Sequence, residues 1–211
     1  MLIDFHSHHA AAYSIFCNPD ASETAQSTAL LTCAGLLPQL WTQERQQRLY
    51  ELLDSRAYLQ VGEIGLDRRF DDIIPMERQL AILKEELAFA ISRGRCISLH
   101  CVRATKPMLD LLSGLDFRPY SILWHGFTGS PETAAELKKL RVILSVGPRF
   151  TGNINELLKA NPFIVPETDY EGSDDAEHQR ILQNQYLRFP SHYPTESQKL
   201  FNLFKYGPTE T

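Results

Sequence analysis

Residues 58–101 read YLQVGEIGLDRRFDDIIPMERQLAILKEELAFAISRGRCISLHC and hold one complete strand-helix-strand unit. Between two short apolar runs, apolar side chains recur at helical spacing with charged residues opposite: Leu80, Leu83, Leu87 and Ile91. This pattern predicts a helix over Pro75–Arg93, which Gly94 ends. Strands joined by such helices are typical of a parallel sheet covered by helices.

The same alternation continues along the chain and predicts eight strands. They are Met1–His6, Tyr13–Cys17, Ala29–Leu36, Tyr58–Gly65, Cys96–Cys101, Ser121–Phe127, Val142–Val146 and Phe163–Glu167. Further helices are expected over Thr105–Leu115, Pro131–Leu140 and Asn153–Ala160. The sequence therefore predicts the α/β class and, within it, a (β/α)8 TIM-like barrel.

The chain length predicts that this barrel is trimmed or distorted near its first βα unit. A complete (β/α)8 barrel typically takes ~250 residues, whereas this chain has 211 and is expected to form one domain over 1–211. Between His8 and Tyr13 there is no room for a crossover helix, because a parallel connection needs about a dozen residues. We expect a short or irregular second element, and a C-terminal segment, Asn184–Thr211, that packs outside the barrel.

Composition limits the classes of partner. The formal net charge is −5, whereas proteins that grip long duplex nucleic acid by charge carry a basic excess, so a nucleic-acid substrate must be held locally. No basic stretch precedes an apolar run at the start, and no window approaches the ~20 apolar residues of a membrane span. These features predict a cytoplasmic protein without a membrane segment.

The cysteines are scattered without a Cys-x-x-Cys pair, and we expect reduced thiols at Cys17, Cys33, Cys96 and Cys101. Cys101 follows His100 directly. Because neighbouring residues on a strand point to opposite faces, Cys101 is expected to be a half-buried thiol and not a metal ligand.

Four of the seven histidines fall at or near the C-terminal ends of predicted strands: His6, His8, His100 and His125. The active site of a parallel barrel lies at this rim. His6 and His8 are two residues apart, so both rings can face one ion. Asp4 has the same parity and is expected to support one of these rings from behind. The remaining histidines lack this context and are expected to be solvated or structural: His9, His178 and His192.

Two carboxylates at strand ends, Glu63 and Asp169, complete a candidate metal-binding set. Each of the six residues taken singly is more often structural, but together they recur on five predicted strand ends. Four histidines and two carboxylates exceed the needs of one tetrahedral ion and suit two divalent ions about 3.5–4 Å apart. Imidazole with carboxylate favours zinc, manganese or iron over calcium; the choice among zinc, manganese, magnesium and iron stays open.

Five short motifs resemble the successive signatures of TatD-type metal-dependent deoxyribonucleases, a branch of the amidohydrolase superfamily. They are Asp4-Phe5-His6-Ser7-His8, Gly62-Glu63-Ile64-Gly65-Leu66-Asp67, Leu99-His100-Cys101-Val102-Arg103-Ala104, His125-Gly126-Phe127-Thr128-Gly129 and Pro166-Glu167-Thr168-Asp169. The resemblance spans Met1 to about Gly172. It implies a TIM-barrel phosphodiesterase that cuts nucleic acid and has a two-metal site. By matching position, His6, His8 and Asp169 would bind one ion, Glu63 would bridge, and His100 and His125 would hold the second.

The chain resembles a shortened member of this family. Members are usually longer and have a first crossover helix and fuller C-terminal helices. They also tend to carry Gly-x-His-Pro at the end of the third strand, near the substrate, where this chain reads Gly35-Leu36-Leu37-Pro38. Leu37 therefore stands in the place of a histidine, and we expect a retained metal site with a different substrate groove.

The expected mechanism is hydrolysis of DNA or a small phosphodiester by a water that two cations activate, in one metal-dependent hydrolase domain. Glu63 and Asp169 are the catalytic candidates, with Asp169 orienting the water or accepting its proton. Arg103 and Arg69 are candidates for binding the phosphate. Trp124 and Phe127 flank His125 and are candidates for stacking a base, although aromatic residues at strand ends more often belong to the core.

Two alternatives stay open at this point. The same activated water would attack the carbonyl carbon of a cyclic amide, an ester or a lactone, because neither fold nor ligand set fixes the substrate. A catalytically inactive homologue that keeps a metal site for stability is the other. Turnover of a generic phosphodiester would distinguish the phosphodiesterase hypothesis from both alternatives. The oligomeric state is not predicted.

Overall fold

The computed structural model of the chain describes residues 1–18 and 28–208. Its eight strands are all parallel and lie side by side in chain order. They are β1 (Asp4–Ser7), β2 (Ser14–Asn18), β3 (Leu31–Ala34), β4 (Gln60–Asp67), β5 (Ile97–Val102), β6 (Ile122–Trp124), β7 (Ile143–Val146) and β8 (Ile164–Pro166). Each strand overlaps its predicted range, and the (β/α)8 architecture is confirmed.

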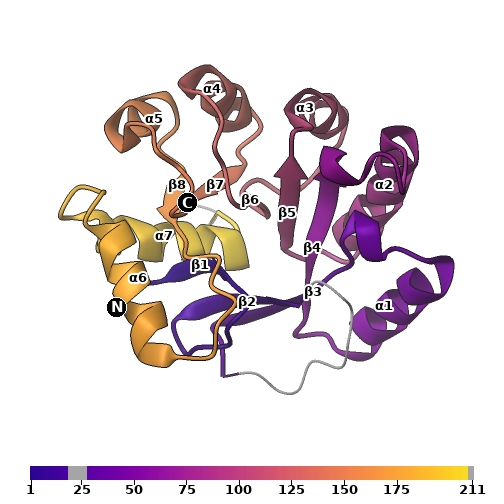
Figure 1. The fold of residues 1–211 in the computed structure, drawn as a ribbon, viewed down its shortest axis with the longest axis horizontal. Helices are drawn as coiled ribbons and strands as arrows, with labels where there is room; N and C mark the ends of the chain where they lie inside the picture. The colour runs from indigo at the N-terminus through magenta and orange to yellow at the C-terminus, as the bar shows by residue number, and fades with distance from the viewer. Residues whose placement is uncertain (19–27, 209–211) are drawn as a thin grey trace.

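Helices that follow β3 to β7 lie around the outside of the strands (Figure 1). They are α1 (Gln43–Ser55), α2 (Met76–Ser92), α3 (Thr105–Ser113), α4 (Pro131–Lys139) and α5 (Ile154–Ala160); two 3-10 turns, η1 (Pro38–Leu40) and η2 (Arg68–Phe70), precede α1 and α2. α2 to α5 were predicted, but α1 was not. Thr42 caps α1 by accepting a hydrogen bond from the Arg45 N–H at 3.1 Å.

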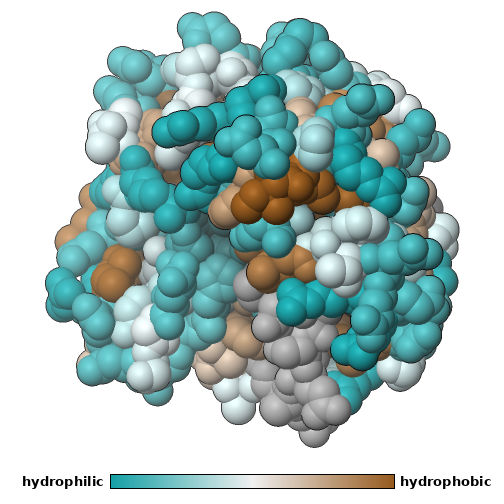
Figure 2. Space-filling view, turned by 45° about the vertical axis from the view of Figure 1, so that its right-hand side comes forward, coloured by the Kyte–Doolittle hydropathy of each residue, from teal (hydrophilic) through white to brown (hydrophobic). Residues whose placement is uncertain are grey.

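Most large apolar side chains lie in two buried clusters, while the face in Figure 2 is mostly hydrophilic. The larger cluster fills the layer between strands and helices, where Trp124 of β6 is 3% exposed and Phe127 is 2% exposed. Both rings therefore belong to the core, as is more usual for aromatic residues at strand ends, and not to a base-stacking surface. The smaller cluster includes Ile15, Leu123 and Val165.

The connection between β1 and β2 consists of residues 8–13 alone and contains no helix, as the trimmed first unit predicts. The two strands are nevertheless parallel neighbours, and the Asp4 N–H donates to the Tyr13 carbonyl at 2.9 Å. β1 has four residues and rises about 10 Å, whereas six extended residues reach up to about 20 Å. Residues 8–13 can therefore run back along the length of this short strand and start β2 without a crossover helix.

The barrel closes between β1 and the segment that follows β8. The Asp169 N–H donates to the His6 carbonyl at 3.0 Å, and the His8 N–H donates to the Tyr170 carbonyl at 2.9 Å. The buried Asp4 side chain also accepts from the Thr168 N–H at 2.9 Å and from the Thr168 hydroxyl at 2.6 Å. These bonds join the first and last strands although no regular ladder pairs them.

The C-terminal part forms two helices, α6 (Asp175–Tyr186) and α7 (Tyr193–Tyr206), so helix begins before the expected boundary at Asn184. Cys96, at the start of β5, donates to the Phe204 carbonyl at 3.0 Å, which places α7 across the N-terminal end of the barrel. Phe201 and Phe204 belong to the smaller apolar cluster. The segment Asn184–Thr211 was expected to pack outside the barrel, and α7 does so across its N-terminal end, where its aromatic side chains join the smaller cluster; residues 209–211 lie outside the described residues.

The cysteines behave as the sequence predicts. All four are free, with Cys17, Cys33 and Cys96 buried and Cys101 half-buried. Among the described residues, no helix is both long and apolar enough to cross a membrane.

We expect Phe204→Ala to lower the free energy of unfolding by about 3–5 kcal/mol, because it removes a ring with 0% exposure from the barrel's closed end. Tyr206→Ala, on the same helix but 70% exposed, should change it by less than about 0.5 kcal/mol. Urea denaturation followed by circular dichroism measures both. Equal decreases in the free energy of unfolding in the two variants would contradict the packing of α7 against the N-terminal end of the barrel.

Candidate metal centre

Six candidate side chains meet at the C-terminal end of the barrel. They are His6 in β1 and His8 directly after it, Glu63 within β4, His100 within β5, His125 directly after β6 and Asp169 shortly after β8. Parallel strands direct their carboxyl ends to the same rim, which is why residues far apart in sequence meet there. The structure thus brings together the full set that the sequence singled out.

The first group comprises His6, His8, one oxygen of Glu63 and one oxygen of Asp169. Each histidine Nε2 lies 3.5–3.6 Å from Glu63 Oε2 and from Asp169 Oδ1. These separations exceed hydrogen bonds but equal the spacing of ligand atoms about 2.1 Å from one shared ion. His6 Nε2 is buried and has no hydrogen-bond partner among the described residues. An orphaned ring nitrogen facing two carboxylates fits a cation site.

The second group is built on the other oxygen of Glu63. Glu63 Oε1 lies 2.6 Å from His100 Nδ1 and 2.5 Å from His125 Nε2, and these two nitrogens are 3.2 Å apart. These are hydrogen-bond distances, shorter than the spacing of ligands around an ion. Glu63 therefore faces one histidine pair with each oxygen, which is the arrangement of a bridging ligand.

The first two histidines are oriented by their Nδ1 atoms. His8 Nδ1 is 2.8 Å from the Cys17 carbonyl, which can only accept, so His8 Nε2 carries the lone pair that faces the site. His6 Nδ1 is 3.2 Å from the Ser98 hydroxyl. Asp4 contacts neither ring, and the expectation that it supports one of them is wrong. Asp4 instead accepts from the His6 backbone N–H at 3.3 Å.

The three remaining histidines lie outside the candidate centre, and two of them are paired with aspartates. His178 is 0% exposed, and its Nε2 lies 2.6 Å from Asp4 Oδ2. His9 Nε2 lies 2.6 Å from Asp175 Oδ1, and His192 stands at the start of α7. None of them belongs to the two ligand groups.

Asp67 supports His100 and was not singled out from the sequence. Its Oδ2 lies 3.1 Å from His100 Nε2, so His100 is held on one side by Asp67 and on the other by Glu63. Arg69 in turn donates to both Asp67 oxygens, at 2.5–3.1 Å. Asp67 has the same strand parity as Glu63, which was the available sequence signal.

The pKa values of Glu63 and of the two histidines at its Oε1 atom are shifted in different directions. Burial opposes charge on His100, but Asp67 and Glu63 raise its pKa to about 9. Burial lowers the pKa of His125 to about 4. Burial would raise the pKa of Glu63, but the neighbouring histidines hold it well below its usual range. The metal-free protein at neutral pH therefore carries a protonated His100 beside an ionised Glu63.

An open pocket lies directly over these groups. Its walls include Arg69, Arg103, Arg149 and Leu37. The two arginines predicted as substrate contacts thus lie at the site, although Arg69 is paired with Asp67. Leu37 makes one wall apolar at the position where the resemblance implies a histidine. Arg149 was missed because nothing in the sequence near it indicates contact with a ligand residue.

Comparison with known sequences identifies relatives. Residues 12–188 match the family described as TatD related DNase. A 3'-5' ssDNA/RNA exonuclease TatD from Enterobacter lignolyticus is 35% identical over 91 residues, which is 43% of this chain and 34% of that protein. The uncharacterized metal-dependent hydrolase YabD of Bacillus subtilis is 29% identical over 106 residues, 50% of this chain and 41% of that protein. The chain therefore matches less than half the length of these relatives.

Comparison with solved structures agrees on the fold. The crystal structure of YjjV, a TatD homologue from Escherichia coli, has a TM-score of 0.75 at 22% identity and covers 92% of this chain and 86% of that one. The family match begins at residue 12, after His6 and His8, so these two residues join the candidate centre through geometry.

We expect Mn²⁺ binding at pH 7.5 to release at least about one proton, because a pKa of about 9 keeps His100 protonated until a cation displaces the proton. Release should decline as the pH rises through 9, where the metal-free ring is already neutral. Calorimetric titration in buffers of different ionisation enthalpy measures the proton count. His100→Asn should reduce it and His192→Asn should not; heats independent of buffer would contradict the protonation scheme.

Proposed function

The chain belongs to the TatD-related DNase family, and on that premise we propose that it is a metal-dependent hydrolase that cleaves phosphodiester bonds in single-stranded nucleic acid. The relatives that match it include proteins named as nucleases and as a metal-dependent hydrolase. Their activities concern chains much longer than the matched stretch, so the assignment rests on this protein's own residues.

The division of Glu63 between two histidine pairs carries the proposal. One oxygen faces His6 and His8, and the other faces His100 and His125. A single carboxylate shared in this way would hold two cations, and Asp169 would complete the ligands of the first site. The donors are imidazole nitrogens and carboxylate oxygens, which suit zinc, manganese or iron. The proposed cofactor is accordingly two divalent ions, with magnesium also to be tested.

When bound, divalent cations lower the pKa of water and neutralise charge on phosphoryl oxygens. The protein's own residues supply position and proton transfer. His6 and His8 are fixed by hydrogen bonds to Ser98 and Cys17, so their free nitrogens stay aimed at one point. Asp169 lies at the edge of the pocket with one oxygen toward that point. We assign to Asp169 the orientation of the attacking water and the acceptance of its proton.

Local binding of a short single-stranded end or a small phosphodiester fits the charge of the chain. A net charge of −5 disfavours binding along a long duplex, whereas the pocket walls carry arginines next to the ligand groups. Arg103 and Arg69 remain candidates for phosphate contacts. Arg69 would act mainly through Asp67, to which it donates from two nitrogens.

We expect purified protein to cleave a single-stranded oligonucleotide and bis-p-nitrophenyl phosphate only when Mn²⁺ or Mg²⁺ is present. His100→Ala should lower the rate by more than about 100-fold, because it removes a ligand facing Glu63. His192→Ala is the matched control, since His192 lies at the start of α7 and outside both ligand groups.

Elemental analysis of the same samples separates the alternatives. Two bound metals without cleavage of either substrate would overturn the phosphodiesterase assignment and direct the search to amide, ester or lactone substrates. Full activity of His100→Ala would remove His100 from the mechanism.

A further inference from the structure

The loop between β7 and α5 begins with a tight turn over Gly147–Phe150. The Phe150 N–H donates to the Gly147 carbonyl at 3.1 Å. Pro148 occupies the second position of the turn, where its fixed φ angle is favourable. Arg149 is therefore the third residue of a turn whose shape is set by the sequence around it.

Arg188, just after α6, fastens this turn at both ends. It donates to the Gly147 carbonyl at 2.9 Å and to the Phe150 carbonyl, and its guanidinium lies 5.7 Å from the centre of the Phe150 ring. Arg188 itself is held by Gln185 at 2.6 Å. A separate helix thus fixes the backbone that carries Arg149, so little ordering remains to be done when a ligand binds.

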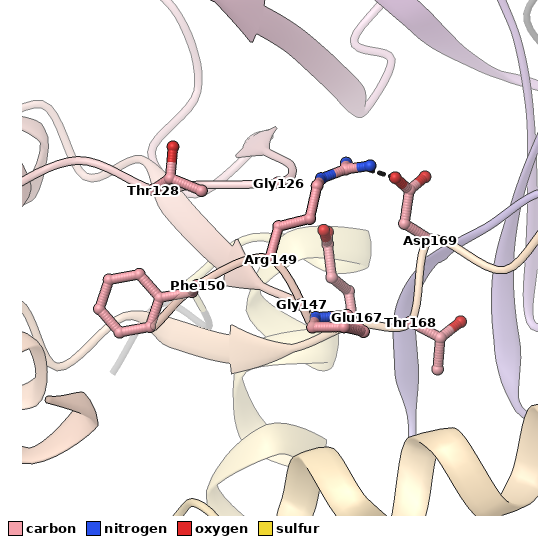
Figure 3. Close-up of a pocket in the computed structure, with 9 residues that line it drawn as sticks. Gly126, Thr128, Gly147, Arg149, Phe150, Glu167, Thr168 and Asp169 are labelled. Atoms are coloured by element: carbon pink, nitrogen blue, oxygen red, sulfur yellow. Dashed lines mark hydrogen bonds and ion pairs between the residues drawn. The ribbon is translucent and has the colours of Figure 1, made fainter. Parts of the chain in front are cut away.

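The Arg149 side chain extends from this turn to Asp169 (Figure 3), donating to Asp169 Oδ2. The other oxygen of Asp169 is the one that faces His6 and His8. Arg149 crosses over Gly126, where an added Cβ would meet its guanidinium at 3.5 Å. The guanidinium consequently contacts the outer oxygen of a carboxylate whose other oxygen belongs to the first ligand group.

Arg149 is also open to a ligand. Its side chain is 68% exposed, and it borders the pocket over the ligand groups as well as the adjoining hollow lined by Thr128 and Glu167. A guanidinium has five N–H donors in a planar fork, and the contact with Asp169 engages one terminal nitrogen. Among the described residues the guanidinium has no other hydrogen-bond partner, so its remaining donors are available to a ligand in the pocket that Arg149 lines.

We infer that Arg149 binds an anionic oxygen of the substrate's phosphate beside the metal centre, an inference that rests on the proposed phosphodiesterase function. A planar fork pairs with two phosphate oxygens at once. Arg69 borders the same pocket, but its fork is already engaged by both Asp67 oxygens. Arg149, by contrast, donates to the candidate metal ligand Asp169, so its guanidinium lies next to the place where the phosphate would bind.

Substitution of Arg149 tests the inference in the Mn²⁺-loaded enzyme. Arg149→Ala should lower kcat/KM for a single-stranded oligonucleotide by about 10- to 100-fold. Arg149→Lys keeps the charge but loses the fork, so its loss should be intermediate. Arg48→Ala removes an arginine of matched exposure, 69%, on the distant helix α1, and should leave kcat/KM within about twofold.

Inorganic phosphate serves as the direct binding probe. Its competitive inhibition constant should rise at least about tenfold in Arg149→Ala, while elemental analysis shows unchanged manganese content. Unchanged kcat/KM and unchanged inhibition in that variant would overturn the inference and leave the nuclease assignment standing. Loss of manganese would also overturn it, because Arg149 would then act by positioning Asp169. In a protein that cleaves no oligonucleotide, calorimetric titration with phosphate replaces the inhibition assay; binding that is lost in Arg149→Ala would support the phosphate contact and refute the nuclease.

Discussion

The buried carboxylate of Asp4 holds the seam where the first and last strands of the barrel meet. It accepts hydrogen bonds from the backbone N–H groups of His6 and Thr168, from the Thr168 hydroxyl and from His178. A carboxylate with 0% exposure is tolerated only when such donors surround it. His6 and Asp169 flank this seam, so the first ligand group exists only where the barrel has closed.

This dependence explains how a trimmed chain brings all six candidate ligands together. The candidate ligands lie in or directly after the strands, and their positions follow from strand order and closure. The first crossover helix contributes to neither, because the four-residue β1 is retraced by residues 8–13 alone. The pocket wall, in contrast, differs from what the family resemblance implies, because Leu37 lines it where a histidine would be expected. The arrangement of the candidate ligands at the rim is thus independent of a complete outer layer of helices.

Sequence reasoning reached the strands and the ligands because both are local patterns: short apolar runs, with polar residues at their ends. It missed α1, whose apolar face is narrow, with Leu49 and Leu53 among few buried side chains. Asp67 was within reach through its parity with Glu63. Arg149 was not, because its contact depends on a turn fixed by Arg188 from a different part of the chain. The features that could not be predicted are therefore contacts between segments that lie far apart in the sequence.

The position of α7 bears on how the protein is made. All six candidate ligands precede residue 170, yet the aromatic side chains that fill the N-terminal end of the barrel lie at Phe201 and Phe204. A nascent chain that has emerged only as far as Asp169 carries all six candidate ligands, but without α7 the apolar side chains at the N-terminal end of the barrel are uncovered. Covering of this end therefore waits for α7, which is synthesised after all six candidate ligands.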